Sequence, residues 1–419
     1  MRIVHISTFD ILGGAARAAF RLHRGLLRLG QESLFYVSQE ISRDETVRPF
    51  IPPRDILSRL STACRREFLK RRLARYRDTR PEGYELFSTL PAHSSKAMLS
   101  QIPDCDIVNL HWVANFVNYR PFFTVMPKRV PIVWTFHDMN PLTGGCHYDE
   151  ECGKYTEGCG ACPQLGSGDP KDLSFKMWKC KQKAFLSVPQ SRLTVAAPSR
   201  WLAAKAKESP FYAQFRVETI PYGIDLEDFK PRNRLLARDL LGIPKNDRVV
   251  LFVSDWIQNP RKGLQLLLRC MEGLSDQNDI FFVSMGKGPP PSISGIKYSS
   301  LGHVEGDRFL SLVYSAADLF VIPSSQDNLP NTVIESLACG TPVIGFDIGG
   351  IPDMVRPGVT GQLAQKANGL TLKTAILDLI RDDDKLKKMS TNCQQIAQTE
   401  YSLETQAKKY IELYRQILG

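Results

Sequence analysis

The sequence has no apolar run near the roughly 18 residues of a membrane-spanning helix, which argues against an integral membrane protein. It also has no internal repeat and no low-complexity tract, so a solenoid or a long disordered tail is not expected. Residues 1–7 fit a first buried strand and lack the longer apolar core of a signal peptide. We therefore expect a cytoplasmic protein whose ten cysteines are reduced or bind a metal.

Acidic residues are scarce in one segment, residues 54–80, which holds ten Arg or Lys and three Asp or Glu, while the whole chain has a net charge of +10. The segment also carries apolar residues spaced mostly by three or four: Ile56, Leu57, Leu60, Cys64, Phe68, Leu69, Leu73 and Tyr76. This pattern predicts an amphipathic helix that binds an anionic membrane surface. The alternative is a solvated helix that docks on its own domain by the same apolar stripe. Nucleic acid is the weakest candidate partner, because the charge sits in one helix without interleaved stacking positions.

Short β-branched runs alternate with amphipathic segments along the whole chain, which indicates parallel sheets covered on both faces. The expected strands are 2–7, 33–38, 106–110, 132–136, 193–197, 249–254, 280–285, 319–322 and 342–346, and the expected helices include 15–29, 263–274, 307–317 and 331–339. At 419 residues, two domains are expected. We predict an α/β protein of two doubly wound Rossmann-like domains, 1–221 and 222–400. The sequence allows the last helix, within 401–419, to pack on either domain, and we predict that it packs on the first.

Ligands of such sheets bind beyond the carboxyl ends of the strands, so the residues there are the first candidates. In the first half these are Gly13 and Gly14, which follow the first strand, then His111, and then His137 with Asp138. The glycines suit an anion at a helix start or, equally, a tight turn. They do not complete a dinucleotide fingerprint, and no acidic residue follows the second strand where that fingerprint needs one.

Four cysteines, Cys146, Cys152, Cys159 and Cys162, lie within seventeen residues of one Gly-rich loop. Their thiolates could form a closed tetrahedral zinc site that orders the loop. The spacing of the first pair is wider than in a zinc ribbon, so reduced or mutually bonded structural cysteines are the alternative.

The second half places Arg261 and Lys262 after one strand, directly before a helix. Two cations there can hold a diphosphate and stabilise the charge that develops as it leaves. Residues 323–335 follow another strand and begin a helix. Asp327 lies in the loop and Glu335 on the helix, where carboxylates can accept hydrogen bonds from sugar hydroxyls. Backbone groups near Pro330 could receive phosphate or sugar oxygens.

The segment 323–344, with Gly-Gly-Ile-Pro-Asp at 349–353, resembles the E-x7-E signature region of family 4 of the retaining glycosyltransferases. Further segments fall in that family's order: Pro-Tyr-Gly-Ile-Asp at 221–225, Arg-Lys-Gly at 261–263, Gly-Lys-Gly-Pro at 286–289 and Leu-Gly-His-Val at 301–304. The resemblance implies the two-domain GT-B fold with a cleft between the domains. The cysteine loop is similar to that of a subgroup from exopolysaccharide clusters, including colanic-acid synthesis.

The resemblance also implies roles for single residues. Arg261 and Lys262 would clamp the donor diphosphate, Glu335 would bind the donor ribose, and Asp327 would hold a sugar hydroxyl. His111 would touch the donor sugar near the reacting carbon, and His137 and Asp138 would serve the acceptor side. The remaining donor contacts would come from Gly13, Gly14, Val304, Asn328, Leu329, Asn331 and Thr332. Asp327 and Asp353 both depart from the family, which has Glu at these positions, and this leaves the donor-sugar contact open.

We therefore predict transfer of a sugar, with retention, from a nucleotide sugar to a glycan acceptor that is lipid-linked, in exopolysaccharide synthesis. No Asp-x-Asp follows a strand end, so no catalytic metal is expected, and structural zinc is the one cofactor predicted. The expected location is the cytoplasm, at the inner face of the cell membrane. The alternatives are a nucleotide-sugar epimerase and a non-catalytic GT-B scaffold at the membrane.

Overall fold

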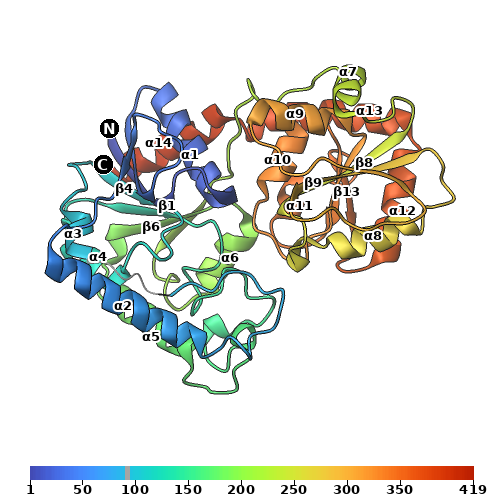
Figure 1. Cartoon of the computed structure of the whole chain (residues 1–419). Helices are drawn as coiled ribbons and strands as arrows, with labels where there is room; N and C mark the ends of the chain where they lie inside the picture. The colour runs from blue at the N-terminus through green and yellow to red at the C-terminus, as the bar shows by residue number, and fades with distance from the viewer. Residues whose placement is uncertain (90–94) are drawn as a thin grey trace. The chain divides into compact units, whose positions relative to one another are not determined.

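The computed structural model describes residues 1–89 and 95–419, which divide into two compact units. Residues 1–220 together with 407–419 form the first unit, and residues 221–406 form the second. Each unit is a parallel sheet with helices on both faces (Figure 1). Among the described residues, no helix is both long and apolar enough to cross a bilayer.

The first unit is built on seven described strands, all parallel, in the order β3-β2-β1-β4-β5-β6-β7. The strands are β1 (Arg2–Phe9), β2 (Glu32–Gln39), β3 (Val47–Pro49), β4 (Ile107–Leu110), β5 (Ile132–Thr135), β6 (Leu193–Ala197) and β7 (Arg216–Thr219). The helices are α1 (Gly13–Arg28), α2 (Ile56–Ala74), α3 (Ser95–Leu99), α4 (Tyr119–Val125), α5 (Leu173–Phe185) and α6 (Arg200–Glu208), with 3-10 turns η1 (Lys154–Thr156), η2 (Pro163–Leu165) and η3 (Gln190–Arg192).

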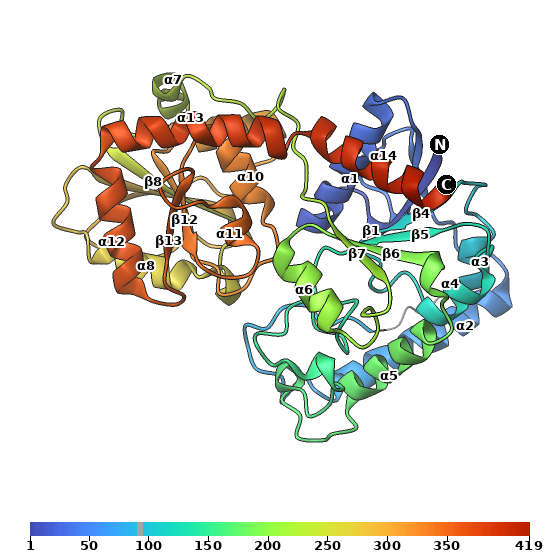
Figure 2. The same ribbon diagram turned by 180° about the vertical axis from the view of Figure 1, so that it is seen from behind.

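The last helix, α14 (Leu403–Leu418), completes the core of the first unit with its C-terminal part. Tyr410 and Tyr414 are fully buried and pack in one cluster with Ile3 and Leu22. Their hydroxyls meet polar groups of the central strands, because Asn109 Nδ2 donates to Tyr414 Oη over 2.7 Å and Thr135 Oγ1 lies 2.9 Å from Tyr410 Oη. Figure 2 shows this helix beside β4 and β5. The apolar face of α14 therefore packs on the sheet of the first unit.

The second unit is built on six described strands, again all parallel, in the order β10-β9-β8-β11-β12-β13. The strands are β8 (Arg248–Trp256), β9 (Ile280–Lys287), β10 (Lys297–Ser300), β11 (Leu319–Ile322), β12 (Val343–Phe346) and β13 (Gly361–Ala364). The helices are α7 (Arg234–Leu241), α8 (Leu264–Glu272), α9 (Asp307–Ala316), α10 (Asn331–Ala338), α11 (Ile351–Met354), α12 (Gly369–Ile380) and α13 (Asp383–Glu400), with the 3-10 turn η4 (Pro260–Lys262).

The strand order reverses beside the first strand of each sheet, between β1 and β4 in the first unit and between β8 and β11 in the second. At such a point the following loops run to opposite sides and leave a crevice at the carboxyl edge of the sheet. The short runs at 319–322 and 107–110 are buried at every position, as strands covered on both faces require. The site residues should therefore follow these four strands.

Candidate functional site

The turn that follows β8 presents two cations at the carboxyl edge of the second sheet. Asn259 begins the turn η4 and its Oδ1 accepts the Arg261 N–H over 3.0 Å. Gly263 ends the turn with a φ of +76°, and an added Cβ would lie 1.9 Å from the carbonyl oxygen of Pro323. Only glycine allows this close approach, which brings Arg261 and Lys262 against the loop that follows β11.

Asp327 joins the two cations in one buried charge cluster. Its Oδ2 lies 2.6 Å from Lys262 Nζ and 3.4 Å from Arg261 Nη1, and Ser324 Oγ donates to the same oxygen over 3.3 Å. Burial alone would raise the pKa of Asp327, but Lys262 and Arg261 outweigh burial and lower the pKa to about 2. The cluster therefore stays ionised at neutral pH and contains one more positive than negative charge.

The backbone around Asp327 is fixed by the glycine turn before α11. Gly349 has a φ of +56°, and an added Cβ would lie 1.9 Å from the carbonyl oxygen of Asp327. That oxygen also accepts the Gly350 N–H over 3.1 Å, and the Asn328 N–H donates to Asp327 Oδ1 over 3.2 Å. The Gly-Gly pair seen in the sequence thus holds the loop that carries Asp327.

The N-terminus of α10 opens directly after this loop. Pro330 precedes the helix and gives it no side-chain cap, so first-turn N–H groups can serve a ligand oxygen. Asn331 and Thr332 are half-buried in this first turn, whereas Asn328 and Leu329 are buried before it. Val304, another predicted donor residue, is half-buried in the segment between β10 and α9.

Glu335 lies one turn further along α10 and is 5% exposed. Its Oε2 accepts a hydrogen bond of 3.1 Å from the hydroxyl of Tyr314, which is buried on α9. Tyr314 and Ser324 were missed in the sequence, because a tyrosine in a helical apolar pattern and a serine after a strand are ordinary there. Both act on the predicted carboxylates rather than replacing them.

At the carboxyl edge of the first sheet, three histidines form a hydrogen-bonded row. His5 Nδ1 lies 2.7 Å from His111 Nε2, and His111 Nδ1 lies 3.1 Å from His137 Nε2. The exposed fraction rises from 0% at His5 through 2% at His111 to 7% at His137. Burial lowers the pKa of all three, to about 4 at His137, so the row is neutral at pH 7.

The donor contact predicted for His111 stays a prediction. Both of its ring nitrogens are engaged by other histidines, and its ring stacks on His5 with centroids 5.0 Å apart. The physical reason is that β4 is central in the sheet and ends between β1 and β5, so the residue that follows it is covered from both sides. His137 is the most exposed member of the row.

Asp138 holds the cysteine-bearing loop in place. Its Oδ2 accepts hydrogen bonds from His147 Nδ1 over 2.6 Å and from Trp112 Nε1 over 2.8 Å, and its Oδ1 accepts the Asn140 N–H over 2.8 Å. Burial would raise the pKa of Asp138, but His147 and these donors lower it. All three hydrogen bonds that Asp138 accepts come from residues of its own unit. Its predicted role in binding the sugar acceptor therefore stays a prediction.

The glycines after β1 lie where the sequence places them. Gly13 and Gly14 open α1, and Leu12 before them gives no side-chain cap. Asp10 was missed in the sequence, although it is fully buried and accepts the backbone N–H groups of Ile41 and Ser42. It ties the loop after β2 to the loop after β1, so its role is structural.

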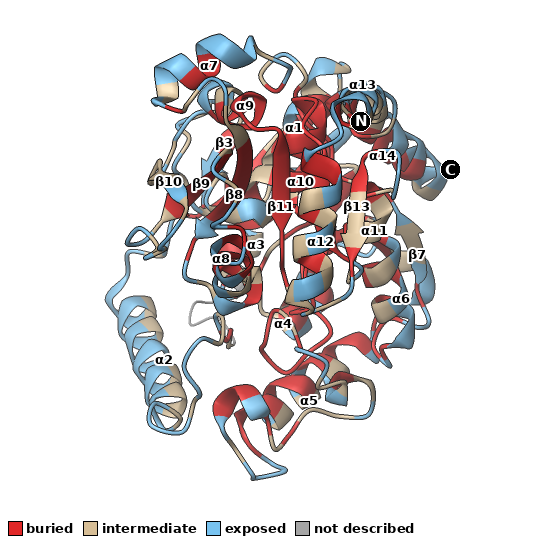
Figure 3. Cartoon of the chain, turned by 90° about the vertical axis from the view of Figure 1, so that its right-hand side faces the viewer, coloured by how far each residue is buried: buried red, intermediate tan, exposed pale blue. Residues whose placement is uncertain are grey.

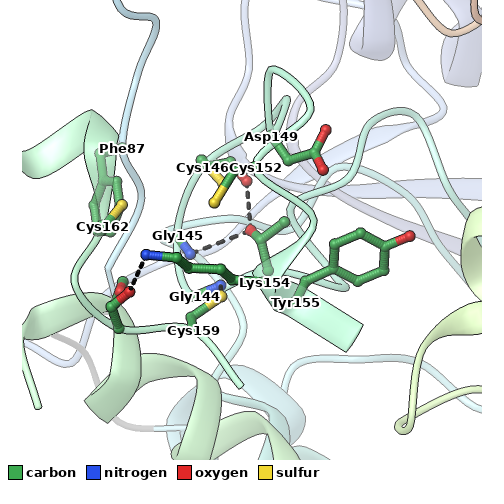
Figure 4. Close-up of a pocket in the computed structure, with 13 residues that line it drawn as sticks. Phe87, Gly144, Gly145, Cys146, Asp149, Cys152, Lys154, Tyr155, Cys159 and Cys162 are labelled. Carbon is green, nitrogen blue, oxygen red and sulfur yellow. Dashed lines mark hydrogen bonds between the residues drawn. The ribbon is translucent and has the colours of Figure 1, made fainter. Parts of the chain in front are cut away.

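The four loop cysteines line one small cavity of about 20 Å³, together with Lys154 and Tyr155 (Figure 4). None forms a disulfide, and burial raises the pKa of Cys146 well above its ordinary value and that of Cys159 to about 12. The donor chemistry is that of a zinc site. Within residues 1–89 and 95–419, however, no three His, Cys, Asp or Glu side chains are grouped so that they could hold a metal ion. Structural zinc therefore stays a prediction.

A comparison with known protein families finds a match within the second unit. Residues 247–382 fit the family model described as Glycosyl transferases group 1. The D-inositol 3-phosphate glycosyltransferase of Mycobacterium sp. (strain KMS) is 35% identical over 159 residues, which are 35% of this chain and 36% of that protein. The protein of the same name from Mycobacterium marinum (strain ATCC BAA-535 / M) is 31% identical over 217 residues, 49% of this chain and 46% of that protein. The chain thus spans about a third to a half of these relatives' length. The family match excludes the cysteine loop, so the exopolysaccharide subgroup stays a prediction.

Solved structures resemble the chain over its whole length. Sucrose-phosphate synthase from Thermosynechococcus elongatus superposes with a TM-score of 0.70 at 17% identity, covering 100% of this chain and 99% of that one. Anabaena HepE in complex with UDP-glucose superposes with a TM-score of 0.66 at 17% identity, covering 99% and 100%. At such identities the likeness shows the fold alone. The predicted GT-B fold of two Rossmann-like domains is confirmed.

Proposed function

We propose that this chain, whose residues 247–382 match glycosyl transferases group 1, transfers a sugar from a nucleoside-diphosphate sugar to a glycan acceptor with retention of configuration. The observation that carries the proposal is the buried cluster of Arg261, Lys262 and Asp327 beside the N-terminus of α10, at the point where the second sheet reverses. Cations and helix N-terminal amides in one crevice suit a diphosphate leaving group.

Lys262 is the most exposed member of this cluster, because its side chain is 22% exposed whereas those of Arg261 and Asp327 are 7% and 6% exposed. In the proposed mechanism the donor diphosphate binds Lys262 and the first-turn N–H groups of α10. Arg261 pairs with the second negative charge of the diphosphate. The carboxylate of Asp327 then accepts a hydroxyl of the donor sugar, and Glu335 accepts the ribose hydroxyls. The bond from the anomeric carbon to the diphosphate oxygen breaks as the acceptor hydroxyl attacks from the same face, and the proton of that hydroxyl passes to the departing diphosphate.

On the first unit we propose sugar-contacting roles for His111 and His137, of which His137 ends the histidine row and is the more exposed. The acceptor is proposed to be a lipid-linked glycan in exopolysaccharide synthesis, at the inner face of the cell membrane. The cysteine loop, whose motif suggested that subgroup, lies directly after His137 and is tied to it through Asp138.

The test is a panel of UDP-, ADP-, GDP- and dTDP-sugars, with binding measured by calorimetry and products by mass. UDP-glucose enters the panel first because it is bound in HepE, and D-inositol 3-phosphate is included as an acceptor because relatives are named for it. One donor should bind, and Arg261→Ala or Glu335→Ala should weaken binding at least tenfold. The matched control is Arg381→Ala, which removes a surface ion pair with Asp279 in the same unit.

The rivals give different results in the same panel. An epimerase would convert the donor sugar without any acceptor, and a scaffold would bind no donor at all. Binding that survives in both the Arg261 and Glu335 variants would place the donor elsewhere and contradict the proposed site.

A further inference from the structure

Helix α2 leaves most of its apolar side chains uncovered. Every residue of Ile56–Ala74 is exposed or half-exposed, and none is buried. Ile56, Leu57, Leu60 and Phe68 have exposed fractions of 74%, 80%, 57% and 58%. Figure 3 shows the helix as a largely exposed rod beside the buried layers of the chain. The docked alternative from the sequence therefore does not account for this stripe.

The apolar residues of this segment separate into two faces. At about 100° per residue, Ile56, Leu57, Leu60, Cys64 and Phe68 fall within a sector of about 120°, whereas Leu69 and Leu73 lie outside it. Leu73 and Tyr76 pack on the cluster that contains Phe87 and Leu165, and the Tyr76 hydroxyl accepts the Leu173 N–H over 3.1 Å. The inner face thus anchors the C-terminal end of α2, whereas the described residues leave the apolar side chains of the outer face largely exposed.

Cations border the outer face on both sides. Arg59, Arg66 and Lys70 follow one edge, and Arg65 and Arg72 follow the other. The Arg72 guanidinium lies over the Phe68 ring, 5.4 Å from its centroid, so its charge sits at the border of the apolar sector. Arg71 and Glu67 both fall within the sector and pair with each other over 2.9 Å, so one ion pair lies among its apolar side chains. An apolar strip between two basic rows matches an anionic bilayer surface in both polarity and charge.

We infer that α2 is a membrane-docking helix, whose face of Ile56, Leu57, Leu60, Cys64 and Phe68 enters the interface of a bilayer containing anionic lipid. The arginines and the lysine at its borders bind the lipid phosphates, and Leu73 and Tyr76 hold the helix to the first unit. This inference extends the proposed lipid-linked acceptor, because it supplies the surface on which such an acceptor would be met. It does not depend on catalysis.

Co-sedimentation of the full chain with vesicles tests the inference, with no nucleotide sugar or acceptor present. The chain should bind vesicles of phosphatidylglycerol and phosphatidylcholine and bind much less to phosphatidylcholine alone, and salt should weaken binding. Arg65→Gln with Arg66→Gln should lower the partition coefficient about 25-fold, at roughly 5-fold per charge. Leu57→Ser with Phe68→Ser should lower it at least about tenfold.

Two double variants in the second unit are matched controls. Lys387→Gln with Lys388→Gln removes exposed charge from α13, and Leu236→Ser with Leu240→Ser removes exposed leucines from α7. Neither should change vesicle binding, and circular dichroism should show all four variants folded.

Three results would overturn the inference. The first is unchanged vesicle binding in both α2 variants. The second is binding to duplex RNA that the arginine variant lowers and the apolar variant does not, which would indicate a general polyanion surface. The third is a dimer in light scattering that Leu57→Ser with Phe68→Ser converts to a monomer, which would assign the face to a second copy. A failed donor screen would leave the vesicle result standing, so the two proposals fail separately.

Discussion

Asp327 shows how a single substitution relative to a familiar motif is accommodated. The shorter carboxylate still reaches Lys262 and Arg261, because Gly263 and Gly349 let two backbone segments approach within van der Waals contact of its loop. Because the family has Glu where this chain has Asp327, the sequence alone left the contact between Asp327 and the donor sugar undecided. In the structure the Asp327 carboxylate contacts both Lys262 and Arg261, so its first role is to hold these two cations in position.

Asp327→Asn should reduce the acid sensitivity of the fold. The pKa of Asp327 is lowered from 3.8 to about 2, so its stabilising effect is complete above pH 4 and is lost as the pH falls from about 4 towards 2. The effect amounts to about 2 kcal/mol at 1.36 kcal/mol per pKa unit. Urea unfolding of wild type and variant should differ by that much more at pH 5 than at pH 2. A constant difference across this range would contradict the charge cluster.

The histidine row should also make stability fall with pH, but over a higher pH range. Burial lowers the pKa of His137 from 6.5 to about 4, so the folded chain keeps this ring neutral where the unfolded chain protonates it. The free energy of unfolding is therefore undiminished above pH 6.5 and falls as the pH drops from 6.5 towards 4. His137→Gln should reduce this slope by about one proton, or about 1.4 kcal/mol per pH unit. An unchanged slope would mean that His137 is already solvated in the folded chain.

At the scale of the element, the central strands were predictable and the edge strands β3, β7, β10 and β13 were not. The runs at 2–7, 193–197 and 319–322 are apolar enough to identify, and they became β1, β6 and β11. The short edge strands β3, β7, β10 and β13 were missed, because three or four residues at a sheet edge carry polar side chains and no clear alternation. Their pairing comes from the neighbouring strand rather than from their own sequence.

The site residues divide in the same way. Arg261, Lys262, Asp327 and Glu335 were predictable because each follows a strand and carries a charge that burial would otherwise penalise. The histidine row was not predictable, because only three-dimensional packing brings His5 and His137 to the two ring nitrogens of His111. For α2 the sequence predicts one apolar stripe, and the structure separates it into an anchoring face and an uncovered face.

Helix α14 should contribute measurably to the stability of the first unit. Tyr414→Phe removes the buried acceptor of Asn109 Nδ2, and an unsatisfied buried donor costs about 1–3 kcal/mol. Four of the five tryptophans lie in the first unit, so fluorescence during urea unfolding reports mainly on this unit. Tyr84→Phe, at a half-buried position, is the control and should change stability little. A Tyr414→Phe variant as stable as wild type would show that Asn109 finds another partner.

The cysteine loop yields a prediction that elemental analysis can decide. The spacing of Cys146, Cys152, Cys159 and Cys162 predicts about one zinc per chain in protein purified under reducing conditions, with a loss of thermal stability on chelation. Finding no zinc would show that the four cysteines pack as ordinary side chains, in keeping with the raised pKa values of Cys146 and Cys159.

At the scale of the whole molecule, the chain repeats one design twice and uses the two copies differently. Each unit is a parallel sheet whose order reverses beside its first strand, and each places its polar residues after the strands on both sides of that reversal. In the second unit these residues are charged and suit a diphosphate. In the first they are neutral histidines and a carboxylate that fixes a loop.

The central claim is that Arg261, Lys262 and the start of α10 hold the diphosphate of a nucleotide sugar. Its most direct test is calorimetric titration of the donor identified in the panel, and of its free nucleoside diphosphate, into wild type, Lys262→Ala and Arg381→Ala. The account predicts that Lys262→Ala weakens both ligands by a similar factor of at least ten, whereas Arg381→Ala changes neither. Equal binding of donor and diphosphate to all three proteins would contradict it.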